Sequence, residues 1–263
     1  FEGVKLLVKL YIPKTKPIQF NMKLKILGTG SSGNCYLLEP DNGKALIIDC
    51  GVNFKKIKEA INFDINSICG AIQSHSHGDH SKFTKDFIKS GINVYMSSQN
   101  QKEIGIKSHR IITIETNKQF QLGDFKVMPF EVNHDVYCLC FLINHPECGT
   151  TLYLTDTSYS NYIFNGLNNL IIESNYSDEI LEKKLYGNTF LRDRIIGSHL
   201  SLETLIEMLD RNDLSKVNNI VLIHLSDSNS HAVEFKNAVQ KATNCNVTVA
   251  NANLTIPFDK TPF

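Results

Sequence analysis

The sequence predicts an α/β protein in which two β-sheets pack face to face with helices on both outer sides, a four-layer αββα sandwich. Short apolar or alternating segments bounded by turn residues fill both halves of the chain. Segments with helical spacing lie between these strands and after them. No repeat, linker or low-complexity stretch divides the 263 residues, so we predict one domain over 22–263.

The start of the chain leaves two interpretations open. Met22 is followed at once by an alternating strand, 24–27, so the domain can begin there. Residues 1–21 are then an N-terminal extension or an extra strand at a sheet edge, formed by 4–12. The interruption of 1–19 by four lysines and two prolines argues against a signal peptide.

The first half of the chain is rich in strands. A glycine-rich loop, 28–34, resembles a phosphate-binding turn, but a strand and not a helix follows it, which excludes a dinucleotide site. Asn53 is a good N-cap for a helix that runs to Ile61, and a second helix begins at Ser81. The predicted strands of this half are 24–27, 35–38, 45–48, 69–73, 94–96 and 111–114.

The second half alternates strands and helices. Gly123-Asp124 marks a hairpin, and Ser201 is a good N-cap for a helix to Leu209. The predicted strands are 119–122, 125–130, 137–144, 151–155, 170–172, 220–223 and 246–250, and the predicted helices are 178–185, 201–209 and 231–243.

Composition narrows the classes of function. The formal net charge is zero, which argues against a long nonspecific nucleic-acid groove but allows a local basic patch. Seven cysteines without regular spacing do not form a disulfide framework, and buried thiols favour a reducing, cytoplasmic location. No apolar run approaches the roughly 18–20 residues of a membrane span, so we expect no membrane partner.

The stretch Ser74–His80, read S-H-S-H-G-D-H, concentrates four potential metal ligands in six residues, with three of the nine histidines of the chain. It lies between a predicted strand and a predicted helix, and such a turn can aim several side chains at one point. Imidazole and carboxylate groups suit zinc, and manganese or iron less exclusively. His75 and His77 can supply one ion, and Asp79 and His80 a second.

Three further candidates stand where an apolar strand stops: His134, Asp156 and His224. Strand ends gather residues from distant parts of a chain at one sheet edge, which is where α/β proteins place their sites. A single His or Asp at a strand end is more often structural, so these three residues indicate a metal site mainly when they are taken together.

The H-x-H-x-D-H motif followed by these residues resembles the metallo-β-lactamase superfamily. The resemblance implies two divalent metal ions, zinc or manganese, and a bridging hydroxide as nucleophile. It assigns His75, His77 and His134 to the first ion, and Asp79, His80 and His224 to the second. Asp156 bridges both ions, and Asp49, at the end of 45–48, supports them from behind.

A closer resemblance connects residues 22–249 with the WalJ (YycJ) family of phosphohydrolases, which is related to ribonuclease Z. It rests on the motifs 27–36, 173–175, 191–201 and 224–229. Ser198, Leu202 and Asn229-Ser230 depart from the family pattern, which leaves the metal ligands intact but puts substrate contacts in doubt.

This resemblance implies substrate contacts as well. His199 corresponds to the histidine that contacts the scissile phosphate and protonates the leaving oxygen, so it and Asp79 are the catalytic candidates. Arg192 and Arg194 can hold phosphate oxygens. Ser32 and Asn34 in the first loop can do the same, although a structural turn explains that loop equally well.

The predicted function is a metal-dependent phosphodiesterase, a nuclease with 5′ exonuclease-like action. A phosphodiesterase of cyclic nucleotides is the alternative, followed by a lactam, lactone or thioester hydrolase and by a binding module without catalysis. The expected partner is a nucleic acid or nucleotide substrate, and a homodimer is left open.

Overall fold

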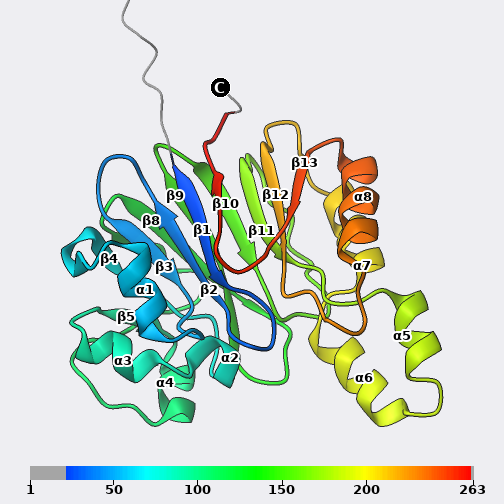
Figure 1. The fold of residues 1–263 in the computed structure, drawn as a ribbon, viewed down its shortest axis with the longest axis horizontal. Coiled ribbons are helices and arrows are strands. Elements are labelled where there is room, and N and C mark those ends of the chain that lie inside the picture. The colour runs from blue at the N-terminus through cyan, green and yellow to red at the C-terminus, as the bar shows by residue number, and fades with distance from the viewer. Residues whose placement is uncertain (1–21, 262–263) are drawn as a thin grey trace, which may run out of the picture.

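Two seven-stranded sheets pack face to face in the computed structural model, which describes residues 22–261 (Figure 1). The predicted αββα sandwich is confirmed. The extension or edge strand expected over 1–21 lies outside the described residues.

The first sheet has the strand order β14-β1-β2-β3-β4-β5-β6. Neighbours from β14 to β3 are antiparallel, whereas β3 to β6 are parallel. Its strands are β1 (Lys23–Gly28), β2 (Cys35–Glu39), β3 (Ala45–Ile48), β4 (Ile68–Ile72), β5 (Val94–Met96), β6 (Ile111–Thr113) and β14 (Leu254–Pro257).

The second sheet has the order β13-β12-β11-β10-β9-β8-β7, in which β7 to β10 are antiparallel and β10 to β13 are parallel. Its strands are β7 (Phe120–Leu122), β8 (Phe125–Val132), β9 (Cys138–His145), β10 (Gly149–Leu154), β11 (Asn169–Glu173), β12 (Asn219–Ile223) and β13 (Asn246–Val249).

Helices cover the outer faces, with α1, α3 and α4 beside the first sheet and α7 and α8 beside the second, while α5 and α6 project from the body (Figure 1). The helices are α1 (Phe54–Ala60), the 3₁₀ turn η1 (Ile65–Ser67), α2 (Gly78–Ser81), α3 (Thr84–Lys89), α4 (Ser98–Ile104), α5 (Asp178–Lys184), α6 (Thr189–Ser198), α7 (Leu202–Asp210) and α8 (Ala232–Thr243).

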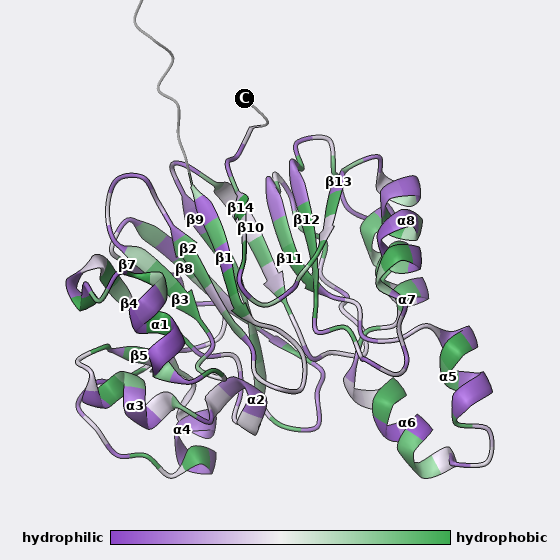
Figure 2. Cartoon of the chain, in the orientation of Figure 1, coloured by the Kyte–Doolittle hydropathy of each residue, from purple (hydrophilic) through white to green (hydrophobic). Residues whose placement is uncertain are grey.

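Alternation along the strands divides the apolar side chains among three layers. In β1, Leu24 and Ile26 belong with Phe141 of β9 to the core between the sheets, whereas Leu27 belongs to the layer under α1 and α3. Apolar residues accordingly concentrate in the strands, while the helices mix apolar and polar residues (Figure 2). Burial of both faces of the central strands holds the strand ends in fixed positions, which is what a site at the sheet edge requires.

Four elements differ from the sequence prediction. The helix expected from Ser81 begins at Thr84 as α3, and Ser81 instead ends the short helix α2, because the Phe83 amide bonds to the Cys50 carbonyl of another loop at 3.0 Å and interrupts the helical pattern. Helices α4 and α6 were not predicted, since α4 has few apolar residues and α6 is mostly exposed. Strand β14 ends at Pro257, which an edge strand tolerates.

The loops at the ends of β3, β4, β10, β11 and β12 converge at the lower edge of the sheets in Figure 1, near α2 and α6. No helix between residues 22 and 261 has the length and apolar run needed to cross a membrane.

Candidate metal centre

The turn after β4 is rigidly held. Buried Gln73 donates from Nε2 to the His75 carbonyl at 3.0 Å, and Asn100 Nδ2 donates to the Ser74 carbonyl at 2.8 Å. His77 is the N-cap residue of α2, so His75 leaves the strand and His77 begins the helix. The chain thereby turns several side chains toward one space at the sheet edge.

Three strand-end residues adopt the left-handed backbone region: Asp49 (φ 64°), Asp156 (φ 48°) and His224 (φ 54°). For residues with a Cβ this conformation is uncommon and marks a local constraint. It ends the alternation of the strand and redirects the side chain along the sheet edge. His134, just after β8, reaches the same place from the second sheet.

The first donor set consists of His75, His77 and His134, whose ligand atoms lie within 4.8 Å of one another. His134 Nε2 is 3.2 Å from His77 Nδ1, while His134 Nδ1 faces the Ser198 carbonyl at 3.1 Å. Buried His75 Nε2 has no hydrogen-bond partner. Tetrahedral zinc with nitrogen ligands at about 2.0–2.1 Å separates them by about 3.3 Å, so a metal ion fits this set.

The second donor set consists of Asp79, His80 and His224. His224 Nε2 lies 3.1 Å from Asp79 Oδ2, and His80 Nε2 lies 3.5 Å from the same oxygen. Asp156 stands between the two sets. Its Oδ2 is 3.1 Å from His80 Nε2 and its Oδ1 is 3.8 Å from His224 Nε2, and it also groups with His75.

Burial and the carboxylates divide the histidines by charge. Burial lowers the pKa of His75, which favours the neutral form that binds metal. Burial opposes protonation of His80 as well, but Asp49 and Asp156 outweigh it and raise the pKa of His80 well above its usual value. Burial opposes protonation of His224 too, but the charge of Asp156 and the hydrogen bond that His224 donates to Asp79 raise the pKa of His224 to about 9. A metal entering the second set therefore displaces protons.

Asp49 holds His80 from behind the site. Its fully buried carboxylate accepts from His80 Nδ1 at 2.7 Å, from the Ser74 amide at 2.7 Å and from the Tyr153 hydroxyl at 2.5 Å. The bond to Nδ1 leaves His80 Nε2 facing Asp79 and Asp156. Tyr153 was not predicted from the sequence, because a tyrosine in an apolar strand carries no signal beyond packing.

His199 follows α6 and is paired with a buried carboxylate. His199 Nδ1 lies 2.7 Å from Glu173 Oε1, and the other oxygen of Glu173 accepts from the backbone amides of Leu200 and Thr157 at 3.3 Å. Although burial opposes it, Glu173 raises the pKa of His199. Sequence reasoning used Glu173 only as part of a motif. Its position at the end of an apolar strand was the signal from which a role in the site could have been predicted.

The four candidate substrate residues other than His199 are placed differently from one another. A cleft of about 360 Å³ over the donor sets is lined by Arg194, His199 and Ser31 among others. Arg192 lies outside that lining, with its Nε 3.5 Å from Asp193 Oδ1. Ser32 lines a neighbouring cavity next to Ser226 and Asn251, and not the cleft.

Asn34, the fourth, is fully buried. Its Oδ1 accepts from the Gly30 amide at 2.9 Å, and its Nδ2 lies 3.2 Å from Asp79 Oδ2 and 2.9 Å from His80 Nε2. Asn34 therefore braces the first loop against the second donor set.

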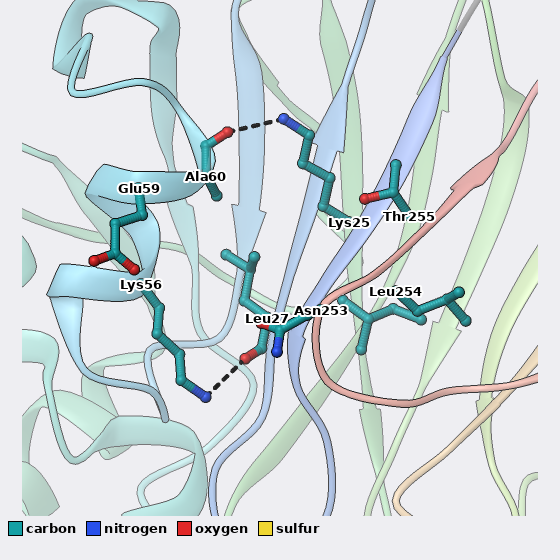
Figure 3. Close-up of a pocket in the computed structure, with 9 residues that line it drawn as sticks. Lys25, Leu27, Lys56, Glu59, Ala60, Asn253, Leu254 and Thr255 are labelled. Atoms are coloured by element: carbon teal, nitrogen blue, oxygen red, sulfur yellow. Dashed lines mark hydrogen bonds between the residues drawn. The ribbon is translucent and has the colours of Figure 1, made fainter.

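Another cavity, of about 340 Å³, lies between α1, β1 and β14 (Figure 3). Its two ammonium groups already bond within the protein: Lys25 Nζ donates to the Ala60 carbonyl at 2.8 Å and Lys56 Nζ to the Leu27 carbonyl at 3.3 Å. None of the residues of the two donor sets lines it, so the cleft beside α6 is the candidate site.

Known proteins share this sequence pattern and fold. Residues 28–166 match the family described as the metallo-beta-lactamase superfamily. Exodeoxyribonuclease WalJ of Streptococcus pneumoniae is 29% identical over 230 residues, which cover 81% of this chain and 84% of the relative. Exodeoxyribonuclease YycJ of Bacillus anthracis is 27% identical over 227 residues, covering 80% and 84%.

Among solved structures, the metallo-beta-lactamase fold protein YhfI of Bacillus subtilis superimposes with a TM-score of 0.70 at 16% identity, covering 89% of this chain and 99% of that one. This similarity shows the fold. Together with the sequence matches, it confirms the resemblance that the H-x-H-x-D-H motif and the motifs of 173–229 predicted.

Proposed function

This chain belongs to the metallo-β-lactamase superfamily, which matches more than half of it, and on that premise we propose a metal-dependent phosphodiesterase that degrades nucleic acid from an end. The observation that carries the proposal is the convergence of two donor sets on Asp156, beside His199 in one cleft. The two curated relatives, both named exodeoxyribonucleases, support nucleic acid as the substrate class.

The donor sets would hold two divalent ions, with His75, His77 and His134 on one, Asp79, His80 and His224 on the other, and Asp156 shared. Nitrogen and carboxylate donors suit zinc or manganese. When bound, such ions supply Lewis acidity, which lowers the pKa of water and neutralises charge on a phosphate.

The protein's own groups perform the remaining steps. His199 donates a proton to the leaving oxygen, because Glu173 holds its Nδ1 and leaves Nε2 for the cleft. Glu173 raises the pKa of His199 against the opposing effect of burial, which favours the protonated form that such a donor needs. Arg194 contacts the phosphate oxygens from α6, and Asp79 orients the attacking water.

Two further points of the proposal concern the protein's surroundings. The seven free cysteines suit a reducing compartment, so we place the enzyme in the cytoplasm. The second point is the oligomeric state: light scattering of the purified protein tests for a homodimer.

The proposal is tested with single- and double-stranded DNA and RNA labelled at the 5′ or the 3′ end, incubated with manganese or zinc. We expect progressive loss of the 5′ label, abolished by a chelator and by Asp156→Ala. Cyclic nucleotides, a chromogenic β-lactam and a thioester are assayed in parallel. Intact polymers together with turnover of any of these small substrates would overturn the nuclease assignment and name the class that replaces it.

A further inference from the structure

A groove of about 690 Å³ opens beside the metal centre. It shares His134 and Asp135 with the lining of the cleft over the donor sets, so the two hollows are adjacent. Its lining comes from the end of β8, the β8–β9 connection, Glu103 of α4 and Tyr162 of the loop after β10. We call it the side groove. Its volume lies within the roughly 300–1,000 Å³ of small-molecule sites.

The side groove is lined by acidic side chains, whereas the cleft over the donor sets also has an arginine in its lining. Glu103, Glu131 and Asp135 line the groove, and its lining includes no lysine or arginine. Arg194, by contrast, lines the cleft on the side of α6. Carboxylates repel phosphates and accept hydrogen bonds from amino groups. We therefore expect the phosphate backbone of a nucleic-acid substrate to lie toward Arg194. The groove suits an uncharged group with N–H donors.

An anchored aromatic ring forms one wall of the side groove. The ring of Tyr162 packs edge-on against Phe130, with centroids 5.0 Å apart, and lies 6.0 Å from the ring of Phe164. Tyr162 nevertheless remains 40% exposed. A ring held from one side and open on the other is a platform for a planar group, and base–aromatic stacking suits every base. Tyr137 adds a second ring beside Glu131.

We propose that the side groove binds the terminal nucleoside of the strand whose phosphodiester lies at the metal centre, with the base on Tyr162 and its amino group toward the carboxylates. The inference rests on the proposed nuclease function and deepens it. The remaining strand leaves past Arg194, so each cleavage removes one terminal nucleotide, and the terminal base must be unpaired to enter.

The test compares single-stranded oligonucleotides with and without a base on the terminal nucleotide. We expect wild-type protein to show a KM at least about fivefold higher for the abasic end, since loss of one base–aromatic stack costs that much or more. Tyr162→Ala should raise the KM for the normal end by a similar factor and erase the difference between ends. Tyr162→Phe, which keeps the ring, should behave like wild type.

Tyr159→Ala is the matched control, because Tyr159 is exposed to a similar degree, 38%, on the same loop but does not line the groove. Tyr162 belongs to neither donor set, so the metal content of wild type and Tyr162→Ala, measured by elemental analysis, should be the same. Glu131→Gln should reduce a preference for terminal cytosine, which has an amino group, over thymine, which has none.

Different outcomes would refute the nucleoside site and the proposed nuclease function. Cleavage of DNA with equal KM for normal and abasic ends in wild type would refute the side groove as a nucleoside site and leave the nuclease intact. Absence of cleavage of any polymer would refute both. The abasic comparison uses the wild-type protein, so it decides the matter even if a Tyr162 variant fails to fold.

Discussion

Replacement of Asp49 by asparagine should weaken both the fold and the second metal site. Four donors converge on this buried carboxylate: the Ser74 amide and hydroxyl, the Tyr153 hydroxyl and His80 Nδ1. An amide has one acceptor oxygen with two lone pairs, so two donors lose their partner. At about 1–3 kcal/mol for each buried donor left unsatisfied, the free energy of unfolding should fall by roughly 2–6 kcal/mol.

Asparagine is the right replacement because it tolerates the left-handed backbone of Asp49, so no strain is added. The free energy of unfolding is measured by urea denaturation of metal-free protein. Zinc affinity is measured by competition with a chelator, and a loss of about 10–100-fold is expected for one of two ions because His80 is no longer oriented.

Tyr153→Phe is the graded control. It removes one donor and leaves the carboxylate with its bonds to His80 and Ser74, so the loss of stability should be about 1.5–3 kcal/mol and the effect on zinc smaller than that of Asp49→Asn. The reasoning is refuted if Asp49→Asn loses less than about 1 kcal/mol with full retention of zinc affinity, since the converging donors would then not depend on the carboxylate.

Asp156→Ala should lose tight binding of both ions together, which elemental analysis after gel filtration measures. Retention of one ion would contradict the role of Asp156 as a ligand shared by the two donor sets. His199→Ala should keep the metal content while turnover falls by about 10²–10⁴-fold, and loss of an ion instead would make His199 a ligand. Burial raises the pKa of the Cys69 and Cys148 thiols to about 12, so both stay protonated, and unreactive toward a thiol reagent at pH 8, until the protein is unfolded. Rapid labelling of either thiol in native protein, mapped by mass spectrometry, would contradict that burial.

The layers of the fold were predictable because most of their strands have local signals. Alternating or wholly apolar runs bounded by turns locate β1, β3 and β12, and a polar cap locates α1 and α7. Helix α6 escaped prediction because most of its side chains are exposed, which removes the periodic pattern.

By itself, the sequence determined the family, the layered architecture and a short set of donor residues, because metal-ligand chemistry needs particular residue types at short spacings and at strand ends. Only the tertiary structure decided which side chains support that set. Tyr153 meets Asp49 across 104 residues, Glu173 meets His199 across 26, and Asn34 turns inward while Arg194 faces the cleft. These contacts depend on how two sheets pack, and no local pattern of residues encodes the distance between strands of different sheets.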